Sequence, residues 1–136
     1  MTIPSETLDI QRFSFSANGI PPPQPGSPET GWWWNPSESG RGFAIEFQGN
    51  SVFLVGFMYD TDGTPVWYLS TGPMTTPTSY TGTWTEYGGG QTMTGPWQPN
   101  KVLANAGPLK LNFSDSRNGT MTLPDGRQIP ITRFQF

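Results

Sequence analysis

The chain has 136 residues, enough for one domain with a hydrophobic core and too few for two domains of ordinary size. Only 12% of the residues are charged and the net charge is −3, with the Lys and Arg residues scattered singly, so we expect no nucleic-acid partner. The sequence contains no Cys and no His, which excludes the nucleophiles and zinc sites built from them. We therefore expect no metal, no cofactor and no enzymatic activity.

The N-terminal part of the chain differs from the rest. Residues 8–16 alternate apolar and polar side chains, which predicts a first strand at a sheet edge. Residues 20–28 are rich in proline, which fixes φ and removes backbone donors, so they predict an extended connector. We therefore assign residues 1–30 to an N-terminal strand or arm with its connector and residues 31–136 to a single domain.

Short apolar segments separated by turn signals follow from residue 40 onward. Residues 42–48 alternate Phe43, Ile45 and Phe47 with other side chains, and the Gly-Asn pair at 49–50 predicts a hairpin turn. Further strands are predicted at 51–59, 65–70, 79–87, 91–97, 107–114, 119–123 and 128–136. A meander of about eight short strands removes its edges by closing, so we predict an all-β antiparallel up-and-down barrel, with a β-sandwich as the alternative.

Six Trp and four Tyr make the chain rich in amphipathic aromatic residues. Indole rings can plug the end of a small barrel and donate their N–H to a carbonyl, or their exposed faces can stack on sugars and small aromatic ligands. Three consecutive Trp residues cannot all point inward, because side chains alternate along a strand. The candidate ligand-binding residues are Trp32, Trp33, Trp34, Asn35, Glu38, Arg41, Trp67, Tyr68, Trp84 and Trp97.

Two ion pairs are predicted from residues with charges in otherwise uncharged segments. Glu38 and Arg41 flank a Ser-Gly turn and can clamp it. Arg133 lies in an apolar closing segment, and we predict that it pairs with Glu46. A catalytic carboxylate pair of Glu46 and Glu86 is the remaining route to hydrolysis, whereas side chains that point to solvent are the simpler interpretation.

The DTDG sequence at 60–63 starts like a calcium loop but lacks the later ligands, including the distal glutamate. Asp and Gly both tolerate the positive φ of a hairpin turn. We therefore predict a turn at 60–63.

Several motifs resemble those of an uncharacterised family of exported proteobacterial β-rich proteins with a GWWWNPxESGRGF…YDxxGxPxWY…ITRxxF pattern. They are GWWWNPSESGRGFAIE at 31–46, FMYDTDGTPVWY at 57–68, YTGTW at 80–84, LNFSD at 111–115 with NGT at 118–120, and ITRFQF at 131–136. The resemblance covers residues 31–136. It implies a periplasmic or extracellular location and carries over no activity, ligand or residue role.

No apolar run approaches the roughly 20 residues that a membrane span requires. Residues 1–6 lack the basic start and apolar stretch of a signal peptide. The N-terminal sequence therefore fits either a cytosolic protein or the mature form of an exported one, and the family resemblance favours export.

These observations favour a non-catalytic exported module that binds a glycan or a small aromatic ligand through Trp and Tyr side chains. The barrel interior is a variant location for that site. The alternative is a protein–protein or assembly module that uses exposed aromatic residues and the N-terminal arm, which is compatible with a homo-oligomer. A carboxylate-based hydrolase is the third interpretation.

Overall fold

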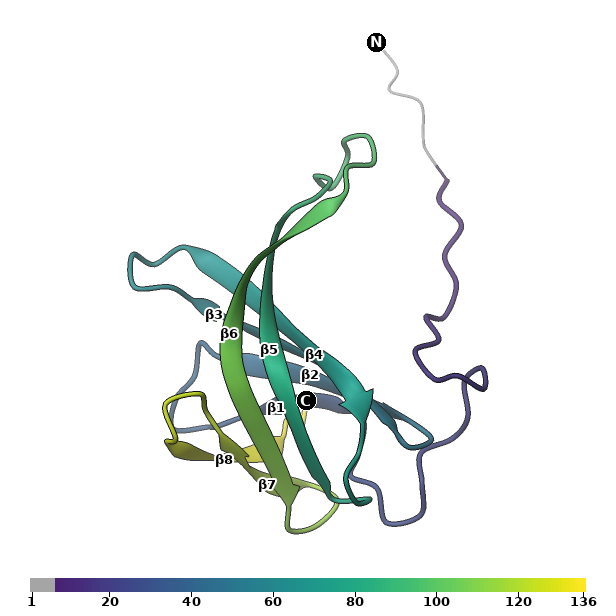
Figure 1. Cartoon of the computed structure of the whole chain (residues 1–136), viewed down its shortest axis with the longest axis vertical. Coiled ribbons are helices and arrows are strands. Elements are labelled where there is room, and N and C mark those ends of the chain that lie inside the picture. The colour runs from purple at the N-terminus through teal and green to yellow at the C-terminus, as the bar shows by residue number, and fades with distance from the viewer. Residues whose placement is uncertain (1–6) are drawn as a thin grey trace.

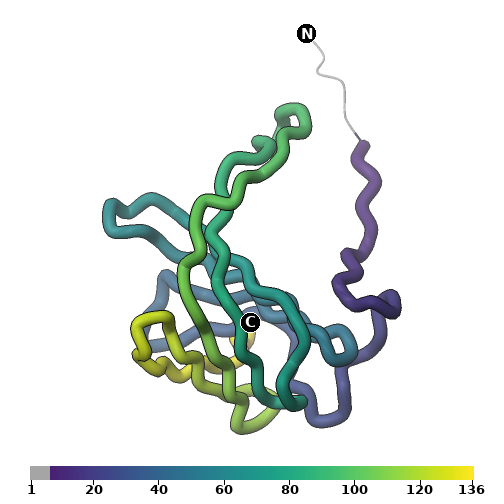
Figure 2. Tube along the Cα trace, in the orientation of Figure 1, coloured from purple at the N-terminus to yellow at the C-terminus, as the bar shows by residue number. Residues whose placement is uncertain are grey.

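The computed structural model describes residues 7–136 and shows a closed barrel of eight antiparallel strands joined in an up-and-down meander (Figures 1 and 2). The strands are β1 (Gly31–Trp34), β2 (Gly42–Gln48), β3 (Ser51–Tyr59), β4 (Pro65–Pro73), β5 (Ser79–Gly89), β6 (Asn100–Phe113), β7 (Asn118–Thr122) and β8 (Gln128–Arg133). Each strand pairs with its sequence neighbours, and β1 pairs with β8 to close the barrel. The predicted all-β barrel is therefore confirmed.

The period-two alternation of the strands separates an inner from an outer face. In β2, Phe43, Ile45 and Phe47 point into the barrel and are almost completely buried. Their neighbours on β3 are Gly56, Leu54 and Val52, which also face inward. The remaining core side chains are Trp33, Met74, Tyr80, Trp84, Leu109, Leu111, Phe113, Met121, Ile129 and Ile131.

The up-and-down topology gives the barrel two different ends. The short connections 49–50, 74–78 and 114–117 lie at one end, which we call the closed end. The connections 35–41, 60–64, 90–99 and 123–127 lie at the other end, which we call the mouth. The β3–β4 and β5–β6 hairpins extend beyond the barrel wall (Figure 1).

Several strand predictions differ from the structure. Residues 8–16 form no strand, and the segment makes a single bridge from Ser16 to Gly19. Residues 91–97 belong to an irregular loop, because β5 and β6 form a long hairpin whose loop spans 90–99. β6 begins at Asn100, well before the predicted start at 107, and the short strand β1 was not predicted as a separate element.

The predicted turns at 49–50 and 60–63 are confirmed. Gly49 and Gly63 adopt φ of 55° and 85°, a region that favours glycine. The Asp60 carboxylate accepts hydrogen bonds from the backbone N–H groups of Asp62 and Thr64, each at 3.1 Å. The Asp residues of this segment therefore hold a hairpin turn together.

The N-terminal arm packs on the outside of the barrel rather than entering the sheet. The rings of Phe13 and Phe15 contact Phe53 on β3, with centroid distances of 5.5 and 5.4 Å. The buried Gln48 side chain donates to the Phe13 carbonyl at 3.0 Å and accepts from the Phe15 N–H at 3.2 Å. These contacts cover part of the apolar outer face of β3.

Arg12 completes this anchor by pairing with Glu46 on the outer face of β2. Burial alone would raise the pKa of Glu46, but hydrogen bonds from Arg12 and Gln48 and the Arg12 charge outweigh burial and lower this pKa. The predicted Arg133–Glu46 pair is therefore wrong. Arg133 lies over Gly31 and donates to the Thr30 carbonyl at 3.2 Å.

Gly82 is required by the packing inside the barrel, and its substitution gives a test of the fold. A Cβ at Gly82 would lie 2.2 Å from the Tyr80 hydroxyl and 2.7 Å from the Ser70 hydroxyl, which hydrogen-bond each other. We expect Gly82→Ala to destabilise the protein by about 1–3 kcal/mol through overpacking, measured by denaturant unfolding followed by tryptophan fluorescence.

Gly72 on β4 is the matched control for this variant. A Cβ there would meet no atom closer than 3.7 Å. We expect Gly72→Ala to be neutral or to stabilise the protein by up to about 1 kcal/mol, since alanine reduces the entropy of the unfolded chain. Equal destabilisation by both substitutions would contradict the packing described for Tyr80.

The Arg12–Glu46 pair predicts how readily the arm is cleaved. Glu46→Gln removes the charge that holds Arg12, so trypsin should cleave after Arg12 faster by up to about fivefold, the limit for a partly exposed ion pair. The rate is followed by mass spectrometry. Glu29→Gln, which removes the separate Arg117 pair, should leave this rate unchanged. An unaltered rate in Glu46→Gln would show that the aromatic contacts alone hold the arm.

Candidate functional site

The three consecutive tryptophans of β1 divide between the two faces, as the alternation requires. Trp33 points inward and has an exposed fraction of 0%. Its indole N–H donates to the Glu29 carbonyl at 3.0 Å, and its ring meets Phe113 edge-on at 5.1 Å. Trp33 therefore plugs the barrel near its closed end. This is the structural one of the two roles that the sequence allows for the indole rings.

Trp32 and Trp34 lie on the outer face and are half-buried. Trp32 stacks on Phe57 at 5.8 Å across β2, where Gly42 leaves room for the indole. Trp34 packs edge-on against Phe134 at 5.0 Å. Both indoles therefore already have aromatic partners within the chain.

The predicted Glu38–Arg41 ion pair is present, with a distance of 2.8 Å. Glu38 also accepts a hydrogen bond from the buried Asn35 amide at 2.9 Å, and the Asn35 carbonyl oxygen of the side chain accepts from the Ser37 N–H at 3.1 Å. These bonds hold the β1–β2 loop in place. Asn35 and Glu38 therefore position Arg41 at the rim of the mouth.

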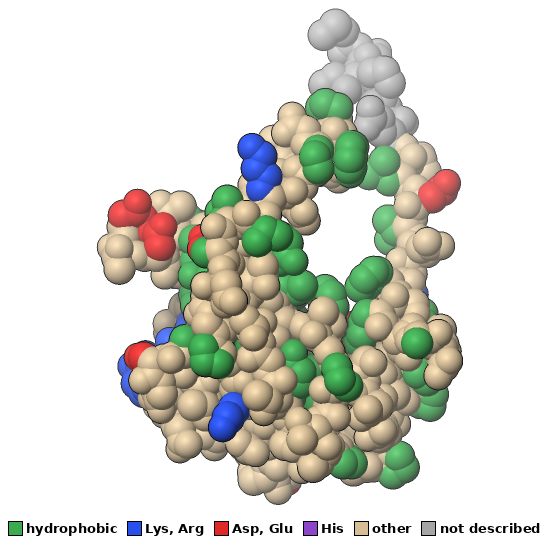
Figure 3. Space-filling model, in the orientation of Figure 1, with side chains coloured by type: hydrophobic (Ala, Val, Ile, Leu, Met, Phe, Trp, Pro, Cys, Tyr) green, Lys and Arg blue, Asp and Glu red, His purple; other side chains and the backbone are tan. Residues whose placement is uncertain are grey.

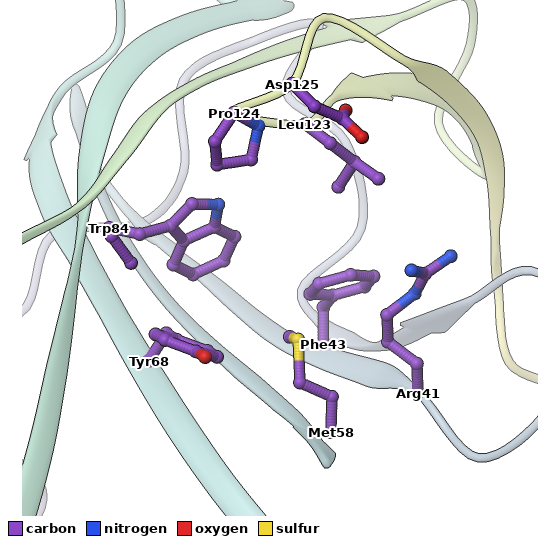
Figure 4. A pocket seen from close by; sticks show the side chains of 9 residues that line it. Arg41, Phe43, Met58, Tyr68, Trp84, Leu123, Pro124 and Asp125 are labelled. Atoms are coloured by element: carbon purple, nitrogen blue, oxygen red, sulfur yellow. The ribbon is translucent and has the colours of Figure 1, made fainter. Parts of the chain in front are cut away.

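A cavity of about 300 Å³ opens at the mouth of the barrel (Figure 4). Phe43, Tyr68 and Trp84 form aromatic walls, and Met58 and Leu123 add aliphatic surface. The rest of the lining is Arg41, Ala106, Pro124 and Asp125. The volume lies at the lower end of the range for small-molecule sites.

Few polar groups face this mouth cavity. Neither the Trp84 indole N–H nor the Tyr68 hydroxyl has a hydrogen-bond partner in residues 7–136. Both groups belong to residues that line the cavity, and neither is buried away from solvent. Arg41 and Asp125 contribute charges at the rim. A guest would therefore meet mainly aromatic surface and a small number of groups that can fix its orientation.

The charges around the mouth are predominantly negative. Carboxylates on the mouth connections and on the β5–β6 hairpin outnumber the cations there; the carboxylates are Glu38, Asp60, Asp62, Glu86 and Asp125, and the cations are Arg41, Lys101 and Arg127. Burial, with smaller contributions from Glu86 and Asp60, raises the pKa of Tyr68 above its ordinary value of 10.0. The Tyr68 phenol therefore stays neutral and able to donate at physiological pH.

A second hollow lies on the outer wall beside the mouth. It has a volume of about 320 Å³ and is bounded by Trp32, Trp34, Phe57 and Tyr59 around the backbone of 39–42. The half-buried Trp67 next to it stacks on Tyr87 at 5.2 Å with the rings nearly parallel, at 12°. Trp32 stacks on Phe57 and Trp67 stacks on Tyr87, so each of these four rings already uses a face that a sugar would need.

Trp97 lies exposed in the 90–99 loop, and another candidate, Trp67, lies beside it. Trp97 lines a shallow polar hollow together with Trp67, Gln91 and Asn100. Of the candidate residues, Arg41, Tyr68 and Trp84 line the mouth cavity, with Asn35 and Glu38 holding Arg41 at its rim. Phe43, Met58, Ala106, Leu123, Pro124 and Asp125 were not predicted there, although the alternation of β2 already pointed Phe43 inward.

Glu46 and Glu86 do not form a carboxylate pair. Glu46 lies on the outer face of β2 beneath Arg12, and Glu86 lies opposite the inward-facing Tyr68 on β4. The catalytic carboxylate pair considered as an alternative is therefore not formed by these two residues. In the described part of the chain, no three acidic side chains gather closely enough to hold a metal ion.

The fold and this site define the class of protein, a small closed β-barrel with an aromatic cavity at its mouth. Comparison with protein-family models, with curated proteins and with solved structures found no match for the chain. Within residues 7–136 there is no helix with the length and hydrophobicity to cross a membrane.

The raised pKa of Tyr68 gives a direct test of the mouth geometry. We expect Glu86→Gln to move this pKa towards 10.0 without reaching it, since burial is the largest cause. The near-ultraviolet absorbance change of phenol ionisation measures it, with Tyr68→Phe identifying the signal. Asp125→Asn, which lines the same cavity but does not shift Tyr68, is the control. A Tyr68 pKa at or below 10.0 in the unsubstituted protein would contradict the buried position.

Proposed function

We propose that this protein is a non-catalytic binding module that takes a small neutral or positively charged aromatic molecule into the mouth of its barrel. The observation that carries the proposal is the open cavity of about 300 Å³ walled by Phe43, Tyr68 and Trp84. An eight-stranded barrel can hold one small ligand at this position. The export expected from the family resemblance is part of the same proposal.

The arrangement of the aromatic rings supports the mouth over the outer wall. Trp84 and Phe43 lie at the cavity with ring centroids 6.2 Å apart and ring planes inclined by 27°, and Tyr68 lies edge-on to Trp84 at 6.3 Å. These separations exceed those of the Trp32–Phe57 and Trp67–Tyr87 stacks on the outer wall, 5.8 and 5.2 Å, and all three rings line the cavity. A glycan needs many hydrogen-bond partners for its hydroxyl groups, and this cavity offers few, so a compact aromatic guest fits its chemistry better.

The charge of the guest follows from the groups around the mouth. Arg41 is already paired with Glu38, and the remaining carboxylates around the mouth, Asp60, Asp62, Glu86 and Asp125, outnumber the remaining cations, so the potential there is negative. Aromatic ring faces also attract cations. An aromatic amine should therefore bind more tightly than the matching aromatic acid.

Titration with three matched indoles tests this proposal. Indole, tryptamine and indole-3-acetate differ mainly in charge and would be titrated by calorimetry and by change in Trp84 fluorescence. We expect tryptamine to bind with a dissociation constant on the order of 0.1 mM, and the acid to bind about tenfold more weakly. Trp84→Phe identifies the fluorescence signal.

Blocking variants locate the site. Ala106 and Leu123 line the cavity, so Ala106→Phe and Leu123→Phe should abolish binding by filling it. Thr83→Phe places the same ring on the exposed outer face of β5 and should leave binding unchanged. Binding unaffected by the blocking variants, or no binding of any indole, would overturn the proposal. A response to oligosaccharides alone would favour a glycan-binding module.

A further inference from the structure

The distal half of β6 is a sheet edge without a partner. β6 pairs with β5 along its length, but β7 pairs with it only from Lys110 to Phe113. Residues 100–105 are all exposed, including Val102 at 66% and Leu103 at 57%. An exposed apolar edge presents unpaired N–H and C=O groups and is a template for another strand.

The N-terminal arm is a strand-like segment without a sheet. Residues 7–11 make no hydrogen bond with any other described residue, and Leu8 and Ile10 are exposed at 76% and 93%. Their alternation with polar residues is the pattern that predicts a strand. The chain therefore carries one exposed segment with the sequence of a strand and one exposed edge that lacks a strand.

We infer that the arm of one copy pairs with the free β6 edge of a second copy, and that two reciprocal exchanges form a symmetric dimer. Each segment has a single charge, Asp9 in residues 7–11 and Lys101 in residues 100–105. Antiparallel pairing that sets Asp9 opposite Lys101 also sets Leu8 opposite Val102. Opposite charges and apolar side chains in cross-strand pairs both stabilise such a register.

The partner is a second copy because the two segments are not paired with each other within one chain. Figure 3 shows an opening between the arm and the β5–β6 hairpin, and no backbone hydrogen bond joins residues 7–11 to residues 100–105. The arm is held in its direction by Arg12 on Glu46 and by Phe13 on Phe53. When the arm of each copy pairs with the β6 edge of the other, the Arg12 and Phe13 contacts are kept. Because the exchange is reciprocal, the assembly contains two copies and does not extend further.

Disulfide trapping tests the inference, since the chain contains no Cys of its own. A Leu8→Cys chain is mixed with an isotope-labelled Val102→Cys chain, oxidised, and analysed by non-reducing electrophoresis and mass spectrometry. We expect labelled–unlabelled dimers joined between positions 8 and 102 to be the main product. Thr78→Cys, exposed in the 74–78 connection at the closed end, replaces Val102→Cys as the control and should give no such product above the random level.

The other trapping outcomes overturn the inference. Mainly 102–102 links would show that two β6 edges pair with each other. A chain that carries both Leu8→Cys and Val102→Cys and yields only internally linked monomer would show that the arm folds back on its own hairpin.

Charge reversal tests the register in the cysteine-free protein. Asp9→Lys and Lys101→Asp should each weaken the dimer about tenfold in sedimentation-equilibrium measurements, because each dimer contains two like-charge pairs, and the double variant should restore it. A monomeric unsubstituted protein at every concentration, or no recovery in the double variant, would overturn the inference. Both experiments are independent of ligand binding at the mouth.

Discussion

Closure of the barrel depends on the short strand β1 and on the indole of Trp33. β1 meets β8 through the pairs Trp33–Arg133 and Trp34–Thr132 and one further backbone hydrogen bond, from the Phe134 N–H to the Trp32 carbonyl at 2.7 Å, whereas β3 and β4 pair along their whole length. Trp33 adds a completely buried side chain and an indole hydrogen bond to Glu29 at this seam. Side-chain burial thus stabilises a junction that has few ladder hydrogen bonds.

The distribution of side-chain volume along the barrel axis creates the cavity. Phe47, Phe113 and Trp33 fill the closed end, with Phe47 and Trp33 both edge-on to Phe113. At the mouth, small residues stand between the aromatic ones: Gly56 lies between Phe43 and Tyr68 in the sheet, and Ala106 lies on the opposite wall. Small residues opposite aromatic side chains leave space that a closely packed interior would otherwise occupy.

The extended hairpins separate two surfaces of the protein. The mouth cavity lies inside the rim, where carboxylates and Arg41 surround aromatic walls. The β5–β6 hairpin passes beyond this rim and exposes Val102 and Leu103 along an edge that no described strand covers. A ligand at the mouth and a partner on the edge would therefore contact different residues. Ligand binding and dimer formation can be tested independently of each other.

The sequence by itself determined the all-β class, the positions of most inner-face residues and the turns at 49–50 and 60–63. These features follow from local rules: side-chain alternation, proline and glycine content, and the φ that a turn requires. Residue spacing also predicted the Glu38–Arg41 pair, which spans one loop. The apolar pattern of 8–16 equally predicts a strand, but a strand needs an edge to pair with, which local pattern does not specify.

Only the tertiary structure decided which side chains meet. Arg12 pairs with Glu46, and Arg133 lies over Gly31. The side chain of Glu86 faces inward, whereas that of Glu46 faces outward. Trp33 and Trp84 point into the interior. On the outer wall Trp32 and Trp67 stack on neighbouring rings and Trp34 packs edge-on, whereas Trp97 remains exposed. Their local sequences could not separate these roles, because strand register and barrel closure join residues far apart in the chain.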